Sequence, residues 1–253
     1  MWIDGIEFMR VPAATYWMGC NHAADNQCPA HRVHVGALFV MRFPVSRADY
    51  DRFLRATGQA APPFWDEPRF SHPQQPAVGP NWDNANAFAA WLSASGRPAE
   101  DVRTSGALRL PTEAEREWAA SGASLDTIYP WGNSPVEPPY GPLGDGPPLL
   151  GATPPNAFGL NHMADGLHEW CEDWYDARWY AVSPRDAPRG PCEGTRKVAR
   201  GGSWRHRTRV TPTRARSSLP PDHQYADFGF RLVMPIDVEY RGDESKAGPS
   251  YSP

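Results

Sequence analysis

The sequence has no apolar run close to the about 20 residues that a membrane-spanning helix needs. Its first ten residues include acidic side chains and have no signal-peptide profile. Lysine is scarce, with only Lys197 and Lys246, and the net charge of −4 argues against a chain-wide electrostatic grip on nucleic acid. We therefore expect a cytoplasmic protein with no membrane or nucleic-acid partner.

Cysteine is scarce as well. The four cysteines are Cys20, Cys28, Cys171 and Cys192. No two of them form a CxxC pair, which argues against a cysteine-type zinc site. In a chain without a secretion signal, scattered cysteines are expected to be reduced thiols. The sequence leaves open whether Cys20 and Cys28 pair.

Proline, glycine and tryptophan are abundant instead, at 29, 22 and 11 of the 253 residues. Aromatic residues make up 12% of the chain, enough to fill a hydrophobic core, so the composition predicts a folded but loop-rich protein. Short helices amid long loops do not form a bundle, and the strands lack βαβ alternation. We expect one α+β domain over residues 1–236 and a polar, flexible tail over residues 237–253.

Local patterns place the expected elements. Ser46 and Gly58 are typical of the two ends of a helix, and Thr112 with Glu115 forms a capping box at the start of another. The expected strands cover residues 6–19, with a turn at Pro12, and residues 31–40; the expected helices cover residues 46–57, residues 83–94 and a segment that ends at Gly122.

Eight segments recur in the order found in one known family. They are MRVPAATYWMG (9–19), FPVSRADYDRFL (43–54), NWDNANAFAAWLS (81–93), RLPTEAEREWAA (109–120), YPWGN (129–133), NAFGLNHMADGLHEW (156–170), RGGSW (200–204) and FGFRL (228–232). Together they resemble the formylglycine-generating enzyme family, also called sulfatase-modifying factors, over about residues 4–235. The resemblance implies a C-type-lectin-like α+β fold with little regular secondary structure.

The chain departs from that family where the catalytic copper is expected. In formylglycine-generating enzymes, two cysteines shortly after the GGS segment bind copper, a metal that soft thiolates favour. Here residues 201–216 contain no cysteine, and His206 takes the place of the first one, while the second falls near Thr211. We therefore expect no cysteine-bound copper and no formylglycine formation; whether another redox metal, copper or iron, is bound stays open.

A second departure concerns calcium. The resemblance implies that an Asp or Asn, two backbone carbonyls and a Glu of the GLYDMxGNVWEW pattern hold a calcium ion, as hard oxygen ligands do. In this chain His162 takes the Asp place, Asp165 the Gly place and Leu167 a carbonyl place, while Glu169 keeps its carboxylate. Two alternatives remain: the calcium site is lost, or Asp165 restores it.

Two histidines stand at positions that line the family's active cleft. His168 replaces a tryptophan there, and His206 replaces the first copper cysteine. Histidine serves as a general base or a metal ligand near neutral pH. We assign His206, His168 and Ser203 as candidate catalytic residues, Ser203 because the corresponding serine of the family helps to hold dioxygen or substrate. The alternative is that both histidines are ordinary loop residues.

Arginines crowd the same region. In an extended segment Arg205, Arg207 and Arg209 share one face, which suits an anionic or carbonyl-rich ligand. We assign these three arginines and Trp204 to substrate binding, with a solvated strand edge as the alternative. For Arg214 and Arg216 we expect structural ion pairs with Asp222 or Asp227.

These features favour an oxidoreductase, oxidase- or oxygenase-like, that acts on a small aromatic or anionic molecule in natural-product biosynthesis. Cysteine-free relatives of the family occur in such pathways. The alternative is a non-catalytic ligand- or protein-binding module, or a maturation subunit of another enzyme, because the implied fold displays variable loops well. We expect a small-molecule substrate and a monomer.

Overall fold

The computed structural model describes residues 1–22, 25–95, 106–124, 126–134, 146–206 and 212–236. Within these ranges the regular elements are short and joined by long irregular segments, so the prediction of a loop-rich α+β protein is confirmed. The tail predicted over residues 237–253 lies outside the described residues.

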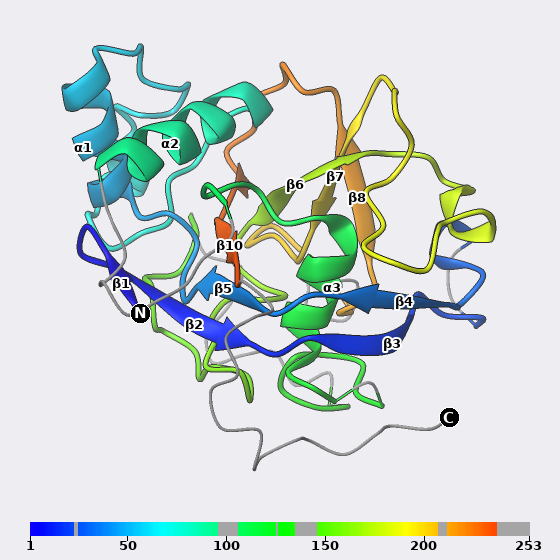
Figure 1. The fold of residues 1–253 in the computed structure, drawn as a ribbon. Helices are drawn as coiled ribbons and strands as arrows, with labels where there is room; N and C mark the ends of the chain where they lie inside the picture. Colours follow the sequence, from blue (N-terminus) through cyan, green and yellow to red (C-terminus); the bar gives the residue numbers. More distant parts are fainter. Residues whose placement is uncertain (23–24, 96–105, 125, 135–145, 207–211, 237–253) are drawn as a thin grey trace.

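The described strands form two four-stranded sheets and one hairpin (Figure 1). The first sheet has the order β1 (Trp2–Ile3), β2 (Ile6–Val11), β5 (Leu38–Met41), β10 (Val233–Pro235), and the hairpin joins β3 (Ala14–Met18) to β4 (His31–Val35). The second sheet has the order β8 (Arg216–Leu219), β7 (Lys197–Arg200), β6 (His168–Trp174), β9 (Phe228–Gly229). Its β6–β9 pair is parallel, whereas the other pairs are antiparallel.

The structure corrects one strand. Residues 31–40 were predicted as a single strand, but β4 ends at Val35 and β5 begins at Leu38. The two strands belong to different sheets, since β4 pairs with β3 while β5 pairs with β2 and β10. The change of sheet falls at Gly36, a residue without a side chain to hold in either core.

Three helices lie between and beside these sheets in the described chain: α1 (Arg47–Thr57), α2 (Trp82–Ser95) and α3 (Glu113–Ser121). Single 3₁₀ turns are η1 (Asp25–Gln27), η2 (Pro68–Phe70) and η3 (Trp179–Ala181). The predicted caps are confirmed, because Ser46 accepts the N–H of Asp49 and the Thr112–Glu115 capping box is complete. No helix in the described ranges has both the length and the apolar character needed to cross a membrane.

The two larger of three apolar clusters in the described chain hold most of the elements together. Helices α1 and α2 lie side by side and bury Tyr50, Phe53 and Phe88 against Trp170 of β6 and Phe230. Helix α3 lies between the β3–β4 hairpin and the second sheet (Figure 1), where its Trp118 stacks on Tyr16 at a centroid distance of 5.4 Å. The chain thus encloses α3 almost completely.

Enclosure forces the charged side chains of α3 to find buried partners. Glu113 accepts two hydrogen bonds from Arg216, at 2.7 and 2.9 Å, and Glu117 pairs with Arg200. All four side chains are buried. The expected pairing of Arg216 with Asp222 or Asp227 is therefore wrong: its partner is Glu113, which lies 103 residues away in sequence and was hidden from local reasoning.

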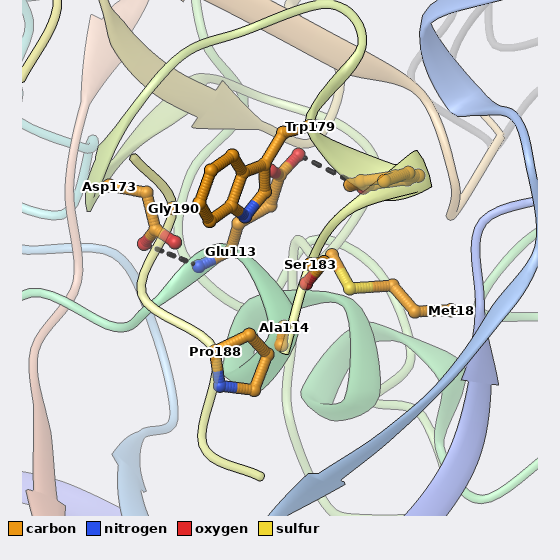
Figure 2. Close-up of a pocket in the computed structure, with 9 residues that line it drawn as sticks. Met18, Glu113, Ala114, Asp173, Trp179, Ser183, Pro188 and Gly190 are labelled. Atoms are coloured by element: carbon orange, nitrogen blue, oxygen red, sulfur yellow. Dashed lines mark hydrogen bonds between the residues drawn. The ribbon is translucent and has the colours of Figure 1, made fainter. Parts of the chain in front are cut away.

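A small pocket lies at the N-terminus of α3 (Figure 2). Asp173 points toward the start of the helix, and its Oδ2 accepts the backbone N–H of Glu113 at 2.8 Å. Burial, together with the charge of Glu113, raises the pKa of Asp173 well above its ordinary value, although the Glu113 N–H opposes this shift. In the native state this carboxyl group therefore stays protonated at higher pH than an ordinary aspartic acid does.

We expect the substitution Asp173→Asn to leave the protein at least as stable as the wild type at neutral pH. The amide keeps an acceptor for the Glu113 N–H but has no charge to bury. Because the pKa of Asp173 is raised in the folded wild type, the folded state binds more protons than the unfolded state. The wild type therefore loses stability as the pH rises from about 4 toward 7. The advantage of the variant should grow over that window, measured by urea unfolding.

The matched control is Asp173→Ala, which leaves the N–H of Glu113 without its acceptor and should cost about 1–3 kcal/mol. If the stability of Asp173→Asn relative to the wild type fell as the pH rises, the raised pKa of Asp173 would be contradicted.

Candidate functional site

The candidate site lies where β6 begins, at one end of the second sheet. His168 is the first residue of β6, and the parallel pairing with β9 places it opposite Phe228. Its backbone N–H donates to the carbonyl of Asp227 at 2.9 Å. Strand β7 ends at Arg200, and Gly201, with a φ of 88°, turns the chain back toward the same place. A side chain at Gly201 would crowd the carbonyl oxygen of Leu167 at 3.2 Å.

Three side chains with metal-ligating or proton-accepting atoms converge there. Donor atoms of His168, His206 and Asp227 all lie within 4.8 Å of one another. The two imidazole rings meet edge to face, with their centroids 5.2 Å apart. His168 and Asp227 are buried, whereas His206 is exposed. The cluster is therefore buried on the side of His168 and Asp227 and open to solvent on the side of His206.

Ser203 fixes the position of the Asp227 carboxylate. Its hydroxyl donates to Oδ2 of Asp227 at 2.9 Å, and the Ser203 hydroxyl oxygen itself accepts the backbone N–H of Arg205 at 3.0 Å. The N–H of His206 donates to the carbonyl of Ser203 at 2.9 Å, which closes a tight turn. The structure thus brings His168, His206 and Ser203 together, while their catalytic role stays a prediction.

Asp227 is the residue that sequence reasoning missed. It was considered only as an arginine partner, yet it contacts Ser203 and approaches both histidines. The available signal was its position directly before the FGFRL segment, but only the β6–β9 pairing brings that segment to His168.

The electrostatic setting keeps His168 neutral. Burial is the main cause that lowers its pKa to about 4, against the attraction of the Asp227 carboxylate, and the nearby His206 ring acts in the same direction as burial. At neutral pH the ring therefore offers an uncharged nitrogen. Its Nδ1 is buried and has no hydrogen-bond partner within the protein.

The predicted substrate-binding residues are placed differently. Trp204 packs beside Phe70 and Leu167, and its indole N–H donates to the carbonyl of Ala226 at 3.1 Å. The guanidinium of the exposed Arg205 lies 4.9 Å from the centre of the Trp204 ring. Arg207 and Arg209 lie outside the described residues.

The residues assigned to calcium do not fit that ion. Glu169 is fully buried, and its carboxylate accepts from Arg116 at 2.9 Å and from Arg231 at 2.7 and 2.8 Å. Burial alone would raise the pKa of Glu169, but the two guanidinium groups outweigh it and lower that pKa. A divalent cation at Glu169 would meet two fixed positive charges.

The other members of that set have partners too. Nδ1 of His162 lies 2.8 Å from Oδ2 of Asp165, and its Nε2 accepts the N–H of Gly151 at 3.0 Å. Imidazole nitrogens are poor calcium ligands, and both are already used. The side chain of Leu167 packs in the apolar cluster with Phe70 and is separate from the calcium assignment, which concerned the backbone carbonyl of this residue. Of the two alternatives, the geometry favours loss of the calcium site.

Comparison with known proteins identifies the family. The model of the sulfatase-modifying factor enzyme 1-like domain matches residues 4–236, so the chain belongs to that family. The resemblance to formylglycine-generating enzymes is therefore confirmed. The formylglycine-generating enzyme of Streptomyces coelicolor is 29% identical over 300 residues, which cover 91% of this chain and 90% of that protein.

Two other relatives are longer than this chain. The serine/threonine-protein kinase pkn1 of Chlamydia pneumoniae is 28% identical over 93% of this chain, but the match spans only 38% of that protein. The hercynine oxygenase of Mycolicibacterium thermoresistibile is 27% identical over 85% of this chain and 55% of its own length.

Solved structures support the same fold. PvdO from Pseudomonas aeruginosa superposes with a TM-score of 0.74 at 22% identity, covering 91% of this chain and 95% of that chain. The variable protein 1 of Treponema denticola superposes with a TM-score of 0.75 at 23% identity, covering 93% and 98%. The predicted fold class is confirmed by these likenesses.

We expect Glu169→Ala to destabilise the protein by about 3–5 kcal/mol, because it leaves the guanidinium groups of Arg116 and Arg231 buried without their carboxylate. The matched control is Glu67→Ala, which removes an exposed pair with Arg69 and should cost about 1 kcal/mol or less. Equal losses in chemical denaturation would contradict the assignment of Glu169 as a buried anchor.

We expect the melting temperature to be unchanged by about 1 mM calcium, a concentration that saturates or half-saturates even weak protein sites. The reason is the two arginines on Glu169 and the two occupied ring nitrogens of His162. Scanning calorimetry with calcium and with a calcium-selective chelator measures this, and a calcium-dependent rise would restore the other alternative, rescue through Asp165.

Proposed function

We propose that this chain is an oxidoreductase, oxidase- or oxygenase-like, that acts on a small molecule in natural-product biosynthesis and does not form formylglycine. The observation that carries the proposal is the convergence of His168, His206 and Asp227 beside Ser203. These groups hold or move protons and bind metals, and they stand in the region where the family's copper cysteines are expected.

The cysteines support the second half of the proposal. Residues 201–216 contain none, so the cluster offers imidazole and carboxylate in place of thiolate. Cys171 is fully buried, and burial raises the pKa of its thiol well above the ordinary value. A thiol in that state is a poor nucleophile and a poor ligand for cuprous copper.

A relative supports the reaction class. The hercynine oxygenase shares 27% identity over 85% of this chain, and its name describes an oxygenase with a small-molecule substrate. The match covers little more than half of that protein, so its own substrate does not transfer to this chain.

Each residue of the site has a role in this proposal. His206 is exposed and therefore meets the substrate first. His168 and Asp227 form the buried wall behind it, and Ser203 keeps the carboxylate oriented through the 2.9 Å hydrogen bond. Arg205 is the described cation nearest to them in sequence, and its exposed guanidinium draws an anionic substrate toward the cluster.

The test is oxygen uptake by the purified protein in air, with small aromatic and anionic compounds first selected because they raise its melting temperature. We expect at least one such compound to be consumed together with oxygen. His206→Ala should lower the rate by a factor of about 100 or more, because it removes the exposed group of the cluster, whether that group acts as a general base or as a metal ligand. The assay is run with and without added iron(II) or copper(II), because the redox metal is open.

His22→Ala is the matched control, since His22 is exposed and belongs to the segment that follows β3. It should turn over like the wild type. Compounds that bind and are recovered unchanged under every metal condition would overturn the proposal and favour the binding-module alternative. Full activity in the folded His206→Ala variant would instead remove His206 from the chemistry.

A further inference from the structure

The donor set at the start of β6 is two imidazoles and one carboxylate. Among the described residues it is the group of three or more histidine, cysteine or acidic side chains whose donor atoms all lie within 4.8 Å of one another. Two of its members are buried, which distinguishes it from the exposed acidic clusters that are common on protein surfaces.

We propose that His168, His206 and Asp227 bind one divalent first-row transition metal, with iron(II) as the ion that this donor set suits best. Two histidines and one carboxylate with free coordination positions are the ligand set of non-haem iron(II) oxygenases. The proposal deepens the proposed function, since it names what the same site holds, but metal binding is measured independently of turnover.

The backbone holds two of the three ligating residues in fixed positions. His168 and Asp227 are joined by the hydrogen bond from the His168 N–H to the Asp227 carbonyl, at the start of the parallel β6–β9 pair, where Asp227 directly precedes β9. Their side chains are about nine-tenths buried. Side chains held at the start of paired strands lose little conformational entropy when they bind an ion.

The third ligand closes the site. Donor atoms up to 4.8 Å apart are slightly too far from one another for metal–ligand bonds of about 2.0–2.2 Å. His206 is exposed and follows the tight turn at Ser203, so its ring can move inward by the small remaining distance. The same exposure leaves the other coordination positions open to solvent and substrate.

Two features already present are typical of a metal site. Ser203 donates to one oxygen of Asp227, as outer hydrogen-bond partners do when they orient a ligating carboxylate. The buried Nδ1 of His168 has no hydrogen-bond partner, an uncommon and unfavourable state for a buried polar atom. An ion bound by this ring would fix its orientation and account for a buried histidine at the end of a strand.

The chemistry excludes calcium and magnesium as occupants. Both ions prefer oxygen ligands, and this set supplies two nitrogens and one carboxylate. The site is also separate from Glu169, whose carboxylate is taken by Arg116 and Arg231. Borderline metals that accept imidazole are therefore the class that remains.

The experiment is anaerobic titration of the metal-stripped protein with iron(II), and with cobalt(II) as a coloured substitute, followed by dialysis and metal analysis. We expect one ion per chain and a visible cobalt absorption band. His206→Ala removes an exposed ligand and should fold normally; its affinity should fall by at least a factor of about ten, and Asp227→Asn should behave likewise.

Matched controls are His22→Ala and Asp222→Asn, which change exposed residues of the same types and should bind as the wild type does. Ser203→Ala should weaken binding by a factor of about 10–100 without removing a ligand. Circular dichroism checks that every variant is folded.

Less than half an ion per chain in the wild type would overturn the proposal, as would equal affinity in His206→Ala, or displacement of cobalt by excess calcium. Stoichiometric binding without oxygen uptake would retain the metal site and reject the proposed function. Oxygen uptake by the metal-stripped protein would do the reverse, so the two failures are distinguishable.

Discussion

The structure depends on one buried carboxylate, that of Glu169, and on the two arginines that neutralise it. Arg116 comes from α3 and Arg231 from the segment after β9, so a single charged group joins a helix, a central strand and the C-terminal part of the described chain. A buried charge without its partners is costly, and this cost enforces one arrangement of the three segments. His168 directly precedes Glu169 in β6, and its position is set by the same requirement.

The burial of α3 also marks the limit of sequence reasoning. Its ends could be predicted, because Thr112 and Glu115 form a local capping pattern and Gly122 adopts the left-handed conformation at the other end. Its surroundings could not, since all nine of its residues are buried, charged ones included. An amphipathic pattern normally leaves such residues in water, and their partners come from far away in the chain.

The site follows the same division between local and distant information. The order of family motifs placed His168, His206 and Ser203 in one cleft, because each lies within or beside a motif whose place in the fold is known. Asp227 enters only through strand pairing across about 60 residues, which no local pattern encodes. The calcium assignment failed for a different reason. Glu169 keeps the residue type expected of a calcium ligand, but distant arginines occupy its carboxylate.

The exposed turn after β7 has a consequence for how such proteins diversify. The residues that decide whether the chain folds are the buried ion pairs and aromatic clusters, whereas His206 stands in solvent at the end of a turn. Exposed positions tolerate replacement at little cost in stability. A substitution at this turn can therefore change the donor atoms that the site presents, while the buried ion pairs and aromatic clusters that hold the fold stay the same.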